Sequence, residues 1–250
     1  MGVNVKLKIL NIMNRLLAAI QFTTILPLGQ SKVYDPKGMV AFFPVVGILL
    51  GTIISIFDQL FLLIWPGHTA AVLDVVLLII LTGAFHIDGL GDAADGLLGH
   101  RSNEKTLSIM KDSRIGVMGL VAILIVLAIK YCGITSMDYQ RSLLIILIPA
   151  YSRGSMLFGI KFLTYGRNSD GTGYNLFNTP LTLFDFSGLL IPIALSFFLG
   201  LQGLWLNILF IGLTALILTY YTKRINCITG DMLGAMTEII EAMLFLLVAI

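Results

Sequence analysis

Residues 116–137 read GVMGLVAILIVLAIKYCGITSM, an apolar run whose single charged residue is Lys130. A helix needs about 20 predominantly apolar residues to cross the hydrocarbon core of a bilayer. The run is long enough, so it predicts a transmembrane helix. Comparable apolar runs occur both before and after it along the chain.

The overall composition also indicates a membrane protein. Of the 250 residues, 57% are hydrophobic and 12% are charged, and the net charge is +2. Soluble domains carry about 25% charged residues, and a soluble fold of this size could not bury so much apolar surface in one core. The composition therefore disfavours a soluble domain and a disordered chain. The small net charge argues against nucleic-acid binding.

Seven apolar segments are candidates to span the membrane. They are residues 39–65, 69–84, 116–137, 143–160, 184–201, 204–222 and 233–250. The segment from Lys6 to Leu28 is interrupted by polar residues, and we interpret it as an amphipathic or re-entrant helix at the membrane surface; a first spanning helix is the alternative. We see no internal repeat or linker. The sequence thus predicts a single all-α domain over residues 1–250, a membrane bundle of about seven spanning helices.

The basic residues favour one orientation of these spans. Most of the 16 Lys and Arg residues fall on one side of the membrane, only Arg141 falls on the other, and Lys130 and Arg153 lie within spans. Cytoplasmic loops carry an excess of Lys and Arg. We therefore expect a cytoplasmic N-terminus, with the polar motifs described below also on the cytoplasmic side.

The first polar motif follows the second predicted span. Asp88, Asp92 and Asp95 are spaced at i, i+4 and i+7, so a helix would place all three carboxylates on one face. Like charges at this spacing repel one another. A bound Mg²⁺ would offset the repulsion, since it takes oxygen ligands and is commonly held by carboxylates and a substrate phosphate. The motif predicts a metal site.

Basic and polar residues continue this motif. Lys111, Asp112, Ser113 and Arg114 combine cations, an acid and a hydroxyl, a set that suits phosphate binding, although Lys and Arg at a span end also act as topology anchors. His86 precedes Asp88 by two residues. It could be a metal ligand, a general base or a structural histidine.

The last predicted span carries a second acidic group. Asp231, Glu238 and Glu241 fall on one helical face, and acids inside a span are functional candidates. They could complete a metal site or supply a general base. Arg153, inside another span, could be their charge partner or a phosphate ligand. A polar loop on the cytoplasmic side could cover a large polar substrate; it holds Lys161, Arg167, Asn168, Asp170 and Asn175.

Three blocks in this order resemble the cobalamin synthase family, also called adenosylcobinamide-GDP ribazoletransferases. The first holds Phe22-Thr23-Thr24-Ile25-Leu26-Pro27 and Phe42-Phe43-Pro44-Val45-Val46-Gly47. The second runs from Thr82 through His86, Asp88-Gly89, Asp92 and Asp95-Gly96 to Ile115-Gly116. The third is Thr229-Gly230-Asp231-Met232-Leu233-Gly234-Ala235 with Glu238 and Glu241. The resemblance covers nearly the whole chain.

The resemblance implies a multi-pass inner-membrane enzyme that needs Mg²⁺. It would join adenosylcobinamide-GDP to α-ribazole, or to α-ribazole 5′-phosphate, and release GMP. The lipid bilayer and these small molecules would be its partners, and the sequence leaves open whether it forms a homo-oligomer.

Residue pattern and resemblance together assign the following roles. Asp88, Asp92 and Asp95 would bind Mg²⁺, with Asp112 or Asp231 completing the shell. Phosphate or substrate binding falls to Lys111, Ser113, Arg114 and Arg153. The candidate general base is His86, Glu238 or Glu241.

Two other functions are alternatives to a cobalamin synthase. A CDP-alcohol phosphotransferase would carry an Ala-Arg pair after the first Asp-Gly, but Leu90-Gly91 follows Asp88-Gly89 here. An ion-coupled transporter would place acids near the middle of the bilayer. Only Glu238 and Glu241 favour that reading.

Overall fold

The computed structural model describes residues 2–29, 35–167 and 173–249, with side chains from Lys8 onward. Lys32, Asn168 and Asp170 lie outside these ranges. Within them the fold is all-α, as the sequence predicts, apart from one isolated bridge between Tyr165 and Ile228.

The α-helices are α1 (Gly2–Thr23), α2 (Pro36–Val40), α3 (Phe43–Leu62), α4 (Gly67–Thr82), α5 (Phe85–Leu97), α6 (Asn103–Ile109), α7 (Val117–Thr135), α8 (Arg141–Phe162), α9 (Leu190–Ser196), α10 (Leu201–Arg224) and α11 (Gly230–Val248). Short 3-10 helices are η1 (Tyr174–Phe177), η2 (Leu183–Leu189) and η3 (Phe197–Leu199).

The described helices support a multi-pass membrane protein with fewer clear spans than the sequence predicts. Four helices, α3, α7, α8 and α10, are long and apolar enough to cross a membrane, and α4 with α5 makes a fifth if the pair is one broken span. The predicted span 184–201 is divided among η2, α9 and η3, and none of these pieces is long enough alone. α11 has the length of a span but carries three acidic residues. Length and composition therefore support four or five of the seven predicted spans.

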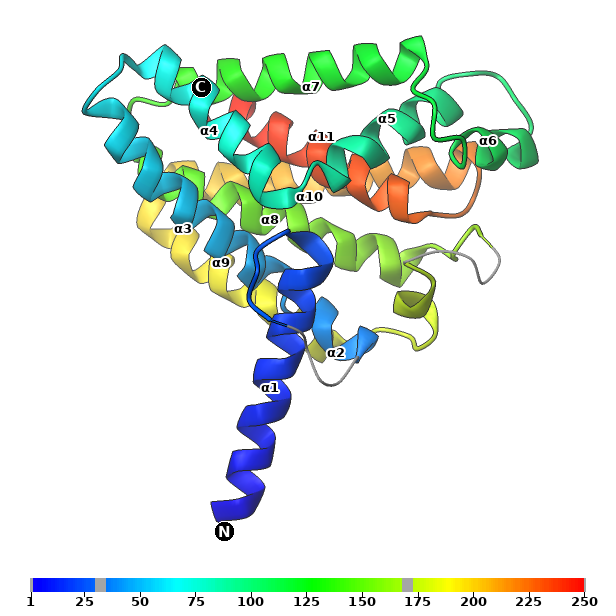
Figure 1. Ribbon diagram of the computed structural model, residues 1–250, viewed down its shortest axis with the longest axis horizontal. Coiled ribbons are helices and arrows are strands. Elements are labelled where there is room, and N and C mark those ends of the chain that lie inside the picture. Colours follow the sequence, from blue (N-terminus) through cyan, green and yellow to red (C-terminus); the bar gives the residue numbers. More distant parts are fainter. Residues whose placement is uncertain (1, 30–34, 168–172, 250) are drawn as a thin grey trace.

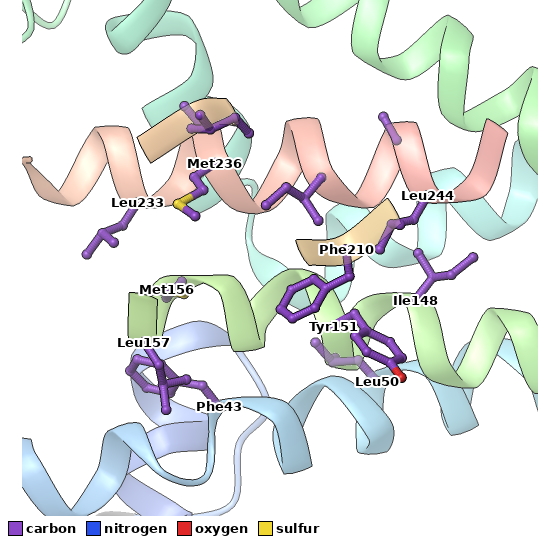
Figure 2. Packing of buried hydrophobic residues seen from close by; sticks show 14 of the residues in the cluster. Phe43, Leu50, Ile148, Tyr151, Met156, Leu157, Phe210, Leu233, Met236 and Leu244 are labelled. Carbon is purple, nitrogen blue, oxygen red and sulfur yellow. The ribbon is translucent and has the colours of Figure 1, made fainter. Parts of the chain in front are cut away.

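α11 lies at the centre of the bundle (Figure 1). It packs against α5, α7, α8 and α10, while α8 also packs along α3. Leu233, Met236 and Leu244 of α11 are buried beside Ile148 and Met156 of α8 (Figure 2). Because lipid is as apolar as these side chains, close packing rather than exclusion of water holds such helices together. The central position of α11 brings its acidic residues into the interior.

α1 leaves the body of the molecule at a steep angle to α7, α8 and α11 (Figure 1). Its C-terminal end packs on α3, where the rings of Phe22 and Phe43 stack with centroids 5.8 Å apart. Closer to its N-terminus, Ile9, Ile12 and Met13 are each about half exposed. α1 is not among the candidate spans found in the described residues. This is consistent with the expected amphipathic helix at the membrane surface.

Candidate active site

α5 begins at a sharp turn after α4. Gly83 (φ 61°) and Ala84 (φ 60°) both have left-handed backbone conformations. Glycine adopts this conformation readily, whereas alanine does so at a cost. The two helices consequently differ in direction by 91°. The turn sends α5 alongside α11.

Two glycines allow α5 and α11 to approach closely. A Cβ on Gly89 of α5 would lie 2.8 Å from the backbone oxygen of Asp231 and 2.9 Å from its Cα. A Cβ on Gly234 of α11 would lie 3.2 Å from the Cα of His86. The missing side chains therefore bring the acidic face of α5 against the start of α11.

A cleft of about 360 Å³ opens where these helices meet the loop after α8. Its lining includes His86 and Asp88 of α5, Met156 of α8 and Asp231 of α11. Arg167, from the loop, lines it as well. The cleft thus combines an imidazole, two carboxylates and a guanidinium in one hollow.

Two of the five predicted metal ligands, Asp88 and Asp231, line this cleft, and a third, Asp92, is close enough to feel their charges. Asp92 lies one helical turn after Asp88. The acidic groups that act most strongly on its carboxylate are Asp231 and Asp88. Arg167 is the cation that offsets them. Burial raises the pKa of Asp231, while Arg167 and Thr229 act in the opposite direction. The group is rich in negative charge and suited to bind a cation.

The donor chemistry fits magnesium only in part. In the described ranges, no group of three or more His, Cys, Asp or Glu side chains is close enough to hold a metal ion. All three carboxylates nevertheless offer the hard oxygen ligands that Mg²⁺ prefers, and Mg²⁺ commonly uses one or two carboxylates with substrate phosphates and water. One or two of these carboxylates, completed by a substrate phosphate and water, would match that pattern, whereas all three together do not form a metal site in the described residues.

Arg167 is held in place by three segments of the chain. Its Nη2 donates to the Asp231 carboxylate and, at 3.0 Å, to the Met110 carbonyl. The bridge between Tyr165 and Ile228 ties its loop to the segment before α11. The sequence predicts Arg167 only as a member of a polar loop. Nothing in the local sequence indicates that this loop returns to α11.

Asp95 has a different environment from the other acids of α5. Its carboxylate accepts hydrogen bonds from the backbone N–H groups of Gly116 (2.6 Å) and Gly119 (2.8 Å). These groups are at the N-terminus of α7, where backbone N–H groups lack partners and a negative charge is stabilising. Asp95 thus anchors α7 to α5.

The basic motif after α6 lies outside the cleft lining. Asp112 and Arg114 pair with each other at 2.6 Å, and this contact lowers the pKa of Asp112 to about 2. Lys111, Ser113 and Arg114 are exposed. The motif follows Met110, whose carbonyl accepts a hydrogen bond from Arg167, a residue of the cleft lining.

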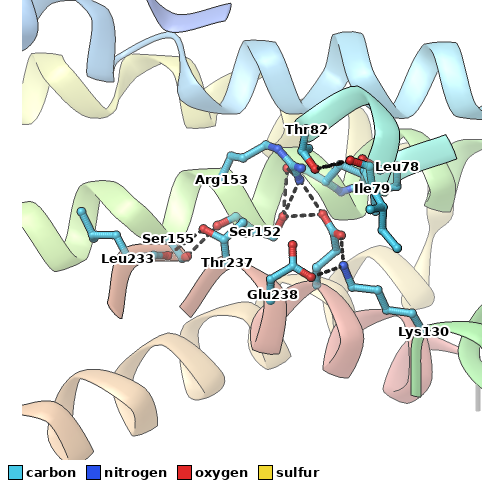
Figure 3. Close-up of polar contacts among 12 residues, drawn as sticks. Leu78, Ile79, Thr82, Lys130, Ser152, Arg153, Ser155, Leu233, Thr237 and Glu238 are labelled. Atoms are coloured by element: carbon cyan, nitrogen blue, oxygen red, sulfur yellow. Dashed lines mark hydrogen bonds and ion pairs between the residues drawn. The ribbon is translucent and has the colours of Figure 1, made fainter. Parts of the chain in front are cut away.

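The acids of α11 beyond Asp231 belong to a buried ion network (Figure 3). Lys130 of α7 donates to Glu238 at 2.7 Å and to Glu241 at 2.6 Å. Glu241 also accepts from Arg153 and, at 3.0 Å, from Ser152 of α8. In the sequence, Lys130 stands out only as a charge within an apolar span. The signal was available, since a lysine inside an apolar span needs acidic partners.

His86 connects the cleft with this network. Its side chain is buried, and its charged neighbours are Arg153, Glu241 and Lys130. Its Nδ1 has no hydrogen-bond partner among the described residues. Glu238, Glu241 and Arg153 do not line the cleft, whereas His86 does. Of the three predicted bases, His86 is the one with access to a bound molecule.

Comparison with known proteins gives a consistent result over the full length. The family model described as cobalamin-5-phosphate synthase matches residues 15–249. An adenosylcobinamide-GDP ribazoletransferase of Clostridium acetobutylicum is 33% identical, with 90% of this chain and 91% of the relative covered. A protein of the same description from Desulforamulus reducens is 35% identical, with 92% and 94% covered. No solved structure matches the chain.

Proposed function

The chain belongs to the cobalamin-5-phosphate synthase family, and we propose that the cleft between α5 and α11 is the active site of its adenosylcobinamide-GDP ribazoletransferase activity. The observation that carries this assignment is the convergence of Asp88, Asp231, Arg167 and His86 on one cleft. Phosphoryl transfer uses carboxylates that bind a metal ion and a cation that neutralises phosphate charge. It also uses a base that accepts the proton of the attacking hydroxyl.

The reaction exchanges the phosphoanhydride bond of a diphosphate for a phosphodiester bond. A ribose hydroxyl of α-ribazole attacks the phosphorus that is attached to adenosylcobinamide. The new P–O bond forms as the bond to the GMP phosphate breaks, so GMP leaves. The hydroxyl proton passes to a base, and the negative charge accumulates on the departing phosphate.

Asp88, Asp92 and Asp231 would supply the carboxylates that hold Mg²⁺, which when bound neutralises charge on the diphosphate. Asp95 and Asp112 have other partners, the N-terminus of α7 and Arg114. We therefore propose the three-carboxylate set rather than all five acids. The repulsion within that set also explains why Arg167 is drawn to Asp231.

Arg167 and His86 would contact the reacting groups. The Arg167 guanidinium carries donors suited to phosphate oxygens, and its Nε has no hydrogen-bond partner among the described residues. His86 lines the cleft and presents an imidazole that can accept the ribose proton. Lys111 and Arg114, which are exposed, would attract the anionic substrate.

We also propose that the cleft faces the cytoplasm, with the N-terminus on the same side and seven membrane crossings. The support is the cluster of cations at the end of the bundle that holds the cleft. Arg224 at the end of α10 binds the Leu97 and Gly99 carbonyls at the end of α5. Arg101 and Lys223 lie close to these residues in sequence. Basic residues are enriched at cytoplasmic membrane boundaries.

One reaction tests the assignment. Purified protein is mixed with adenosylcobinamide-GDP and α-ribazole, with Mg²⁺ or with a chelator, and GMP is measured. We expect release that depends on Mg²⁺ and is lost in Asp92→Asn. Normal membrane insertion of Asp92→Asn with unaltered Mg²⁺-dependent release would refute the metal assignment. Substitution of α-ribazole 5′-phosphate in the same assay tells which acceptor is preferred.

A further inference from the structure

Lys130 is a buried cation in the last two turns of α7. Only 1% of its side chain is exposed, and its Nζ lies 2.7 Å from Glu238 Oε2 and 2.6 Å from Glu241 Oε1. With Arg153, the network contains two cations and two anions, and all four side chains are at least 97% buried. An unpaired charge at this depth is costly. The network is therefore balanced as a whole, with Glu241 shared between the two cations.

Glu241 links Lys130 to Arg153. One carboxylate oxygen faces Lys130, while the other accepts from Arg153 Nη1 and from Ser152 Oγ. Arg153 Nε and Nη2 have no hydrogen-bond partner among the described residues. A purely structural arginine would be expected to use its donors, because unsatisfied buried groups cost free energy.

The unused donors of Arg153 lie close to the cleft. Met156, one helical turn further along α8, lines the cleft. His86 also lines it, and the charges of Arg153 and Glu241 act on its imidazole. Arg153 is therefore buried behind residues that line the cleft, and Glu241 fixes where its guanidinium sits.

We propose that Lys130 is a positioning residue for the transferase reaction, an inference that rests on the function proposed above. Lys130 neutralises the charge of Glu238 and donates to one oxygen of Glu241. The other oxygen of Glu241 therefore remains available to hold Arg153 close to His86. Without Lys130, two carboxylates would compete for Arg153 alone, and the guanidinium would shift away from His86. In this arrangement Glu238 balances charge and does not accept the ribose proton.

Paired substitutions separate this role from a direct one. Lys130→Met leaves the network with one excess negative charge, whereas Lys130→Met/Glu238→Gln restores neutrality and leaves the pair of Glu241 and Arg153. Glu238→Gln and Lys130→Arg complete the set. Arg141→Gln is the matched control, because Arg141 pairs with Asp58 (2.7 Å) and Asp74 (3.2 Å) in a separate buried cluster.

The readouts are kcat and KM for GMP release, together with the thermal unfolding midpoint in detergent. We expect Lys130→Met to lower kcat about 100-fold with little change in KM, as a misplaced active-site group does. The double variant and Lys130→Arg should recover to within about tenfold of the unaltered protein. The kcat of Glu238→Gln should also stay within about tenfold of the unaltered protein. This variant tests the proposal even if Lys130→Met fails to fold. The control should lose stability but keep its kcat.

Two results would overturn the proposal. One is a folded Glu238→Gln variant without activity, which would make Glu238 a direct participant. The other is a double variant as inactive as Lys130→Met although it folds normally. Failure of the unaltered protein to release GMP would instead refute the proposed function, so the two failures can be told apart.

Discussion

Replacing Gly89 with alanine would push apart the two helices that carry the acidic cluster. The added Cβ would lie 2.8 Å from the backbone oxygen of Asp231 and 2.9 Å from its Cα. Non-bonded carbon atoms ordinarily sit about 3.5–4.0 Å apart. Both contacted atoms belong to backbone, so no side chain can rotate away. α5 and α11 would have to separate by about 0.5–1 Å.

The separation should affect catalysis more than folding. Overpacking of this kind costs about 1–3 kcal/mol, and alanine recovers about 0.5–1 kcal/mol because it favours a helix over glycine. A displacement of about 1 Å at an active site can cost 100-fold in rate. We therefore expect Gly89→Ala to remain folded and to lose about two orders of magnitude in kcat.

Gly212→Ala in α10 is the matched control. A Cβ at Gly212 meets nothing within 4 Å, so the same substitution should leave kcat unchanged and raise the unfolding temperature slightly. GMP release at saturating substrate and thermal unfolding in detergent measure both effects. A Gly89→Ala protein that keeps its kcat within about threefold would refute the reasoning, since the close approach of α5 and α11 would then not matter.

Three further predictions concern individual side chains. Asp92→Asn should lower kcat at least about 100-fold, whereas Asp95→Asn should mainly lower the free energy of unfolding, by about 1–2 kcal/mol, because it caps α7; equal losses of kcat, measured in parallel, would contradict this division. Arg167→Gln should raise KM for adenosylcobinamide-GDP about tenfold or more through loss of a charge-assisted hydrogen bond, and an unchanged KM would count against it. Lys111→Gln with Arg114→Gln should raise KM about two- to threefold at low salt and have no effect at high salt, because exposed charges are screened; a salt titration of KM distinguishes this from a direct contact.

The sequence predicted those features that depend on one helix at a time. The run at 116–137 became α7 with similar ends, and the run at 204–222 became α10. The spacing of Asp88 and Asp92 indicated a shared helical face, and in α5 Asp92 follows one turn after Asp88 and feels its charge. Hydropathy and periodicity act locally, so a single sequence is sufficient to read them.

The partners of each side chain could not be predicted in the same way. Asp95 has the same spacing signal as Asp92, yet it binds the start of α7 because α7 happens to begin there. Asp112 pairs with Arg114 two residues away, a contact that spacing does not distinguish from a shared ligand. Lys130 and Glu241 are far apart in the chain and meet only because α7 packs on α11. Periodicity gives the face of a helix but not what lies opposite.

The depth of each acid along α11 decides which of them can take part in the reaction. A helix rises about 1.5 Å per residue, so Glu238 lies about 10 Å beyond Asp231 and Glu241 about 15 Å beyond it. A ribose hydroxyl bound near Asp231 is therefore too distant to pass its proton directly to either glutamate, because proton transfer requires contact at about 2.6–3.2 Å or through one water. His86 faces Gly234, which is only three residues beyond Asp231. The same helix thus has two kinds of acid at two depths: its first turn lines the cleft, and its interior acids form ion pairs with Lys130 and Arg153.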